Sequence, residues 1–230
     1  GYRAELLYVP SDDLSVRITA DYDDYDEICC AVGSTSYGAG NQITAAFGGQ
    51  IIPNDPFTKK AFYDSDPISQ GDNSGLSIHI EKNLDNATIE SITSYRNSYN
   101  FEIQDVDFDA VNIVAPSPIK KDLNGITQEI RIYSEDNEKF NWLFGGFYYQ
   151  EDMDFNESIY FGPLWRPYID AFLPVGTIAE VASAFGLPDS LMFAAGQGNM
   201  ESATQDNSTK SIFAQFDIQL SERLNAIIGA

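Results

Sequence analysis

The sequence predicts an all-β fold: an antiparallel up-and-down transmembrane β-barrel segment of about eight strands with long extracellular loops. Three observations lead to this prediction. Apolar and polar residues alternate over residues 14–22, 76–81 and 211–220, which gives each strand one apolar and one polar face. Short turns and long loops follow one another in strict rotation. Aromatic residues make up 13% of the chain, and they are enriched in strands and in the girdles of outer-membrane barrels.

Four short turns rich in Ser, Asp, Asn and Pro join the expected strands in pairs. Such residues bond to their own backbone or preset its dihedral angles, so they favour tight turns. The turns are residues 10–13, 83–86, 134–138 and 221–223, and they join strands 2–9 with 14–24, 75–82 with 87–96, 126–133 with 140–150, and 209–220 with 224–230. The chain is therefore expected to form four hairpins, and hence eight strands.

The connections between hairpins are much longer, at residues 25–74, 97–125 and 151–208. A compact soluble domain rarely carries three such loops, and a β-sandwich has turns every 8–12 residues or so. An outer-membrane barrel has short turns on its periplasmic side and long loops outside. The third loop is expected to contain a short helix within residues 168–186, capped by Thr177, with Glu180 completing a capping box and Gly186 ending it.

The alternation also predicts which strand residues face lipid and which face the barrel interior. Lipid is expected to face the apolar set, which is Leu14, Val16, Ile18, Ala20, Leu76, Ile78, Ile80, Ile130, Ile132, Ile212, Ala214, Phe216 and Ile218. The barrel interior is expected to face the polar set, which is Arg17, Asp21, His79, Glu81, Glu90, Arg96, Glu129, Arg131, Gln215 and Asp217. Strand 140–150 is apolar on both sides, which predicts that its inner face is partly covered, and Gly145 and Gly146 permit bending or close approach of another backbone there.

Charge restricts the partners of the chain. The formal net charge is −22, which argues against nucleic acid, because binding needs Lys and Arg to neutralise phosphates. It argues equally against docking on an anionic membrane surface. No run of about 18 apolar residues predicts a transmembrane helix, but a barrel strand needs only about 9–11 residues. The acidic clusters predict solvated loops, or alternatively a surface that holds divalent cations.

Residues with catalytic or metal-binding chemistry are scarce. His79 is the only histidine, and it lies on the polar face of an alternating strand, which favours a structural role over that of a base. Residues 105–109 have alternate carboxylates but lack the Gly and terminal Glu of a calcium loop, so they are expected to be solvated or to extend a strand at the rim. The sequence therefore predicts no enzyme, cofactor or metal site.

The two cysteines, Cys29 and Cys30, are adjacent, and neither has another partner in the chain. They form a strained ring, stay reduced or bond outside the chain. Two thiols without a nearby His are a poor ligand set for a metal.

Aromatic residues gather in the longest loop beside an arginine. Tyr160, Trp165, Arg166 and Tyr168 are the candidate ligand-binding residues, because aromatic rings with a guanidinium can grip a planar or anionic ligand. The alternative is that they pack the loop on its neighbours.

Several segments of the sequence resemble barrel segments of TonB-dependent outer-membrane receptors. They are residues 3–15, residues 87–96 with the acidic stretch 105–109, and the hairpin of residues 127–132 and 140–149. The pair Cys29-Cys30 is similar to that of members from environmental proteobacteria. The resemblance implies a 22-stranded barrel with a plugged lumen, of which this chain supplies about eight consecutive strands. Residues 1–230 are then expected to be part of a single barrel domain, without the plug domain.

The same resemblance implies a function. The family imports ferric siderophores, haem, cobalamin or oligosaccharides, driven by the inner-membrane energy-coupling complex. It implies the outer membrane as the location, and as partners membrane lipid, the plug domain, the TonB complex and a ferric siderophore or similar large nutrient.

Two other classes of protein fit the same pattern. A complete eight-stranded outer-membrane barrel with a structural or adhesive role predicts hydrogen bonds between residues 2–9 and 224–230, since a closed barrel has no free edge. A secreted acidic β-sandwich that binds ligand predicts a protein that is a soluble monomer without detergent, with its apolar side chains against a second layer of polypeptide.

Overall fold

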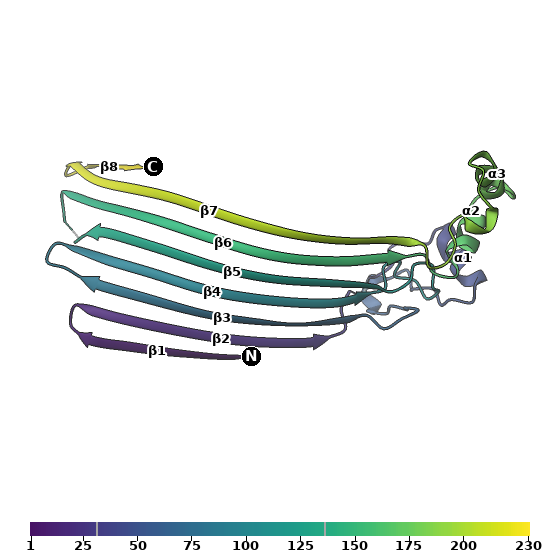
Figure 1. Cartoon of the computed structure of the whole chain (residues 1–230), viewed down its shortest axis with the longest axis horizontal. Helices are drawn as coiled ribbons and strands as arrows, with labels where there is room; N and C mark the ends of the chain where they lie inside the picture. Colours follow the sequence, from purple (N-terminus) through teal and green to yellow (C-terminus); the bar gives the residue numbers. More distant parts are fainter. Residues whose placement is uncertain (31, 136) are drawn as a thin grey trace.

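The computed structural model describes residues 1–30, 32–135 and 137–230, which form one antiparallel eight-stranded sheet (Figure 1). Its strands are β1 (Tyr2–Ser11), β2 (Leu14–Glu27), β3 (Ile68–Asn83), β4 (Ala87–Gln104), β5 (Ser117–Ser134), β6 (Phe140–Tyr160), β7 (Gly198–Ser221) and β8 (Leu224–Gly229). Each strand pairs with the next in the chain. The all-β, up-and-down prediction and its pairing into four hairpins are confirmed, while Asp136 of the predicted turn 134–138 lies outside the described residues.

Short helices lie at the end of the sheet opposite the hairpin turns (Figure 1). They are α1 (Ala39–Ala46), α2 (Trp165–Phe172), α3 (Thr177–Ala184) and two 3₁₀ turns, η1 (Pro56–Thr58) and η2 (Asp189–Leu191). No helix in the described ranges combines the length and apolar character needed to cross a membrane.

The strands extend further toward the loops than the sequence predicts. Strand β3 begins at Ile68, β4 ends at Gln104, and β7 begins at Gly198, so the predicted outer ends of these strands are wrong. The ladder continues because backbone pairing needs no apolar side chain: Asp152 lies opposite Asp206 in unbroken register. Both faces of β7 are largely polar there, whereas β4 keeps its alternation through Phe101 and Ile103.

The cross-strand register places the whole predicted apolar set on one face. Ile18 lies opposite Leu6 on one side and Ile78 on the other, and Ile132 lies opposite Phe144. This apolar face meets no second layer of protein in the described ranges: Leu6 is 61% and Ile212 90% exposed. The predicted polar set lies on the opposite face, so the division into two faces is confirmed.

A small polar cluster interrupts the apolar face. Gln128 of β5 accepts a hydrogen bond from the Thr93 hydroxyl at 2.5 Å and donates one to the Ser91 hydroxyl at 3.1 Å. These three side chains therefore satisfy one another, which lowers the cost of placing them among apolar neighbours.

The edges of the sheet distinguish an open barrel segment from the two alternative folds, a closed eight-stranded barrel and a β-sandwich. Within the described residues, β1 pairs only with β2 and β8 only with β7. The closed eight-stranded barrel is therefore wrong. The sandwich is also wrong, because the part of the chain that the structure describes forms a single sheet with no second sheet packed on it. Figure 1 shows the two edge strands, with the N- and C-terminal ends, on opposite sides of an open sheet.

The inner side of β6 is covered in part, as predicted. Gly145 lies opposite Phe213, and a Cβ at Gly145 would come within 2.2 Å of the Phe213 ring. The close approach is that of a side chain rather than of another backbone.

The predicted helix in the third loop is α3, but its cap is different. The cap residue is Gly176, whose φ of 89° is in the left-handed region, and Thr177 is the first helical residue. The Thr177 hydroxyl donates backward to the Pro174 carbonyl at 2.7 Å instead of accepting from the helix. The predicted capping box is therefore wrong.

Candidate ligand-binding site

The polar face carries a network of ion pairs near the hairpin turns. Glu90 of β4 is at its centre, with the His79 Nε2 2.7 Å from Oε1 and the Arg131 Nη1 3.5 Å from Oε2. The Arg131 Nε also donates to Glu129 at 2.5 Å. His79 is thus tied to a carboxylate on the next strand, in agreement with a structural role.

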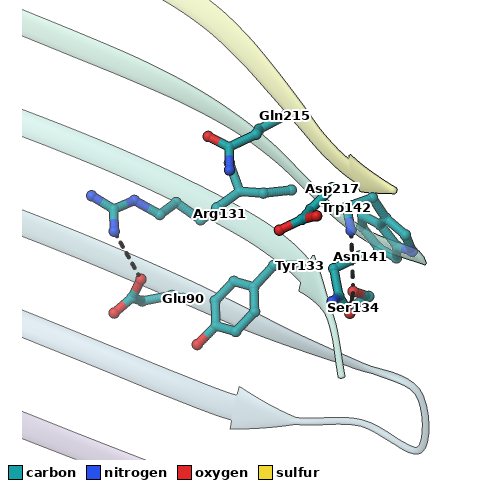
Figure 2. Close-up of a pocket in the computed structure, with 9 residues that line it drawn as sticks. Glu90, Arg131, Tyr133, Ser134, Asn141, Trp142, Gln215 and Asp217 are labelled. Carbon is teal, nitrogen blue, oxygen red and sulfur yellow. Dashed lines mark hydrogen bonds and ion pairs between the residues drawn. The ribbon is translucent and has the colours of Figure 1, made fainter. Parts of the chain in front are cut away.

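A hollow of about 620 Å³ opens beside this network (Figure 2). Its lining comes from β4, β5, β6 and β7, and comprises Glu90, Arg131, Tyr133, Ser134, Asn141, Trp142, Leu143, Gln215 and Asp217. Figure 2 shows the Arg131 guanidinium directed toward Glu90. Because carboxylates, amides and a cation stand side by side, the hollow suits a mixed polar surface such as another polypeptide segment better than an apolar small molecule.

A second hollow, of about 330 Å³, lies further along the polar face toward the loops. It is lined by Tyr25, Ser98, Asn100, Glu102, Lys121 and Leu123. The Asn100 amide donates to the Tyr25 hydroxyl at 2.5 Å and to Glu102 at 3.3 Å. A Cβ at Gly71 would lie 2.4 Å from the Tyr25 hydroxyl oxygen, so glycine is what lets this side chain lie close against β3.

Sequence reasoning missed this second hollow. Its residues are far apart in the chain and meet only through the pairing of β2 to β5. The one local signal is that Asn100 and Glu102 share one face of β4 and alternate with the apolar Phe101 and Ile103 on the other. An aromatic ring, an amide, a carboxylate and an ammonium group together suit a hydroxyl-rich or otherwise polar ligand.

The loops between the long strands pack together into what we term the loop crown, the described residues of 28–67, 105–116 and 161–197. The Thr44 hydroxyl of α1 donates to Asp109 at 2.6 Å, and the Gly162 amide donates to the Ile113 carbonyl at 2.7 Å. The apolar residues that are buried in the described chain all lie here, and they are Val111, Ile113, Ile178 and Ala182.

Three carboxylates gather inside the loop crown. Asp64, Asp105 and Asp107 bring oxygens within 4.8 Å of one another, and Asp105 is only 1% exposed. Burial, with the Asp107 carboxyl beside it, raises the pKa of Asp105 to about 7. Burial also raises the pKa of Asp64 and of Asp107. These oxygens are of the type that hard divalent cations take.

The expectation that residues 105–109 are solvated or extend a strand is wrong for Asp105. Strand β4 ends at Gln104, and the Asp105 carboxylate accepts hydrogen bonds from the Phe108 amide at 3.1 Å and the Asp64 amide at 3.3 Å. The acidic stretch turns inward because the Phe108 amide within it and the Asp64 amide of a neighbouring loop both donate to Asp105. The local sequence does not reveal the second donor.

The predicted ligand residues come from the end of β6 and from α2. Trp165 stacks on Phe161 with ring centroids 4.8 Å apart, and Tyr168 packs on Phe172 at 5.1 Å. Tyr160 is the last residue of β6, and its carbonyl accepts from the Ala115 amide at 2.8 Å. These contacts pack the loop on its neighbours, and a role in ligand binding stays a prediction.

Arg166 uses its guanidinium within the loop crown. It donates to the carboxylates of Asp170 at 2.9 Å and Asp189 at 2.8 Å, and to the carbonyls of Asp189 and Met192 at 3.0 and 3.2 Å. Arg166 thereby ties α2 to the 3₁₀ turn η2.

Comparison with known proteins finds a similar fold among solved structures but no similar sequence. No protein-family model matches the chain, and no curated protein is similar to it in sequence. Among solved structures, the ferric yersiniabactin uptake receptor FyuA from Yersinia pestis is similar, with a TM-score of 0.64, 10% sequence identity, and a match that covers 99% of this chain and 28% of that receptor. The chain thus spans less than a third of the length of FyuA. At this identity the likeness shows the fold alone: the sheet has the architecture of part of a receptor barrel.

Proposed function

We propose that this chain forms eight consecutive strands in the barrel wall of a TonB-dependent outer-membrane receptor, which imports a ferric siderophore or a similar large nutrient. One observation carries the proposal. An uncovered apolar band runs across neighbouring strands on a single face, next to the short turns, and it spans residues 14–22 on β2. That span matches the roughly 9–11 residues with which a barrel strand crosses a bilayer. The likeness to FyuA supports it at the level of fold.

The open edges support a larger barrel. Strands β1 and β8 leave hydrogen-bonding groups free on their outer sides in the described sheet. Free edges favour pairing with further strands, and closure into a barrel removes them. In this proposal the polar face lines the lumen, and the hollow of Figure 2, with Glu90 and Arg131, lies against the plug domain.

Ligand binding is proposed at the opposite end of the wall. The polar hollow around Tyr25 and Lys121 and the loop residues Tyr160, Trp165, Arg166 and Tyr168 lie beyond the apolar band, where an incoming nutrient arrives. Transport further requires the plug domain and the inner-membrane TonB complex as partners.

The experiment is uptake by cells that carry or lack the gene for the full-length protein. Radiolabelled ferric chelates of several chemical classes and growth under iron limitation are the readouts. We expect the full-length protein in the outer-membrane fraction, and we expect at least one chelate to be imported only when the gene and the TonB complex are both present. Recovery of the protein from the soluble fraction without detergent would falsify the proposal.

A matched pair of variants tests the wall hollow. Tyr25→Ala is expected to weaken binding of the imported nutrient, because it removes the aromatic ring from the hollow. Tyr2→Ala, on the apolar face of β1, is expected to leave binding unchanged. Equal binding by the two variants would place the ligand elsewhere.

A further inference from the structure

Cys29 and Cys30 form a disulfide between consecutive residues, just after the end of β2. A disulfide stabilises a fold mainly by closing a loop, and the gain grows with the number of residues enclosed. A bond between neighbours encloses almost none and joins no two separate segments. This disulfide therefore has little to contribute to the stability of the sheet, and its role must be local.

The backbone at the bond is held in an unusual conformation. Cys30 has a φ of 69°, in the left-handed region that residues with a side chain rarely occupy. No other cysteine exists in the chain to exchange with the pair. Opening and closing of the bond is therefore an isolated two-electron step, without reshuffling within this chain.

A carboxylate from another strand stands beside the two sulfurs. Glu102 of β4 lies on the polar face, and one of its oxygens and the two Sγ atoms are within 4.8 Å of one another. The Gln104 amide donates to Glu102 at 2.7 Å and the Asn100 amide at 3.3 Å. The carboxylate is thus held in place from both sides along β4.

We propose that Cys29, Cys30 and Glu102 form a redox-gated binding site for a thiophilic divalent cation. An external dithiol opens the site: one of its thiolates attacks a sulfur of the pair, its second thiolate resolves the mixed disulfide, and the dithiol leaves as its own disulfide. Cys29 and Cys30 are then thiols that have gained two electrons and two protons.

Binding of the cation to the reduced site is the last step. Both thiols release their protons to solvent as the two metal–sulfur bonds form, and Glu102 supplies an oxygen as third ligand. Two sulfurs and a carboxylate suit zinc or cadmium and leave a fourth position for water. The sequence alone offered only two thiols; the third ligand comes from the pairing of β2 through β3 to β4.

The experiment uses the full-length protein in detergent, either oxidised or treated with a dithiol that is then removed. Each form is titrated with Cd²⁺, and the sulfur-to-cadmium absorption and the binding stoichiometry are measured. We expect one Cd²⁺ per reduced chain and none for the oxidised chain at the same site. Reoxidation should release the ion, since the bond consumes both ligand sulfurs. Equal Cd²⁺ binding by the two forms would overturn the proposal.

Two variants identify the ligands. Cys30→Ser should abolish the absorption, while Glu102→Gln should weaken binding at least about tenfold, the loss that even an outer-shell partner of a metal causes. Glu201→Gln, a matched change on the same face of β7, should have no effect. Thermal unfolding should be the same before and after reduction. A Glu102→Gln protein that binds as tightly as Glu201→Gln would show that the carboxylate is not a ligand.

Discussion

Ile18 and Arg17 are consecutive residues of β2 that lie on opposite faces of the sheet. Ile18 is flanked by Leu6 and Ile78 on the apolar face. Arg17 lies on the polar face, where its Nε is 3.7 Å from Glu5 and both side chains are about half exposed. If the apolar face meets hydrocarbon, a charge at Ile18 is costly, whereas the loss of the charge of Arg17 is not.

We therefore expect Ile18→Arg to lower the free energy of unfolding by about 2–4 kcal/mol if the residue lies near the bilayer midplane. Arg17→Leu should change it by less than about 1 kcal/mol, because an exposed ion pair contributes little. Urea unfolding of the full-length protein in lipid vesicles measures both. Equal sensitivity at the two positions would contradict the assignment of the faces.

Asp105 makes the loop crown sensitive to pH. Its pKa in the folded protein is about 7, whereas the pKa of an aspartate in an unfolded chain is about 3.9. Between about pH 4 and pH 7 the folded state therefore binds more protons, and the free energy of opening the crown falls as the pH rises, by up to about 1.4 kcal/mol per pH unit.

Asp105→Asn should reduce that slope and make the crown more resistant to opening above pH 7. The remaining slope belongs to Asp64 and Asp107, whose pKa values are also raised. Amide hydrogen exchange of residues 105–113 across this pH range measures the opening. Asp152→Asn, an exposed position of β6, is the control, and an unchanged slope in Asp105→Asn would contradict the burial of this carboxyl.

At the scale of the element, β6 contains two adjacent glycines in different surroundings. A Cβ at Gly145 would meet the Phe213 ring at 2.2 Å, whereas a Cβ at Gly146 would find its nearest neighbour, the Ser211 carbonyl oxygen, at 3.8 Å. The two positions lie on the polar and the apolar face respectively.

Gly145→Ala should therefore destabilise the protein by about 1–3 kcal/mol through overpacking, and Gly146→Ala should stay within about 0.5 kcal/mol of the parent. Phe213→Ala should relieve the cost of Gly145→Ala in the double variant. Denaturant unfolding of the parent, Gly145→Ala, Phe213→Ala and the double variant gives the coupling energy between these two residues. Additive effects would show that the ring does not lie over Gly145.

At the same scale, Arg166 joins helix α2 to the turn η2 through its guanidinium group. Arg166 donates to Asp170, to Asp189 and to the Met192 carbonyl. We expect Arg166→Ala to increase proteolytic cleavage within residues 187–197, mapped by mass spectrometry, because the loop loses this attachment. Loss of nutrient binding without faster cleavage would instead favour the ligand role predicted for Arg166.

At the scale of the whole molecule, the two free edges determine how the chain behaves alone. An exposed strand edge is a template for pairing with another chain. Residues 1–230 produced alone in detergent should therefore form edge-to-edge assemblies, and the full-length protein should be monomeric. Light scattering after size exclusion distinguishes the two. A stable monomer of the isolated chain would contradict an open barrel wall.

Much of the sheet could be predicted because its signals are local. Turn residues such as Asn83 and Asn86 act within a few positions, and the alternation around Ile18 records which side of a strand meets an apolar medium. These signals gave eight strands, their order and their two faces. The outer halves of β6 and β7 were not predicted, because β7 is polar on both faces there and the apolar residues of β6, such as Met153 and Phe155, lie on the polar face of the sheet instead.

The candidate sites depended on contacts between distant residues. The Asp64 amide reaches Asp105 across 41 positions of the chain, and Glu102 reaches the cysteine pair only because β3 lies between β2 and β4. The loop aromatics were found from their clustering along the chain, but which rings stack on which was not predicted. The sequence by itself determined the strands, the hairpins and the division of the sheet into an apolar and a polar face, since period-two alternation and turn chemistry act over a few residues. Only the tertiary structure decided the strand lengths, the buried carboxylates and the open edges, because these arise from the pairing of segments far apart in the chain.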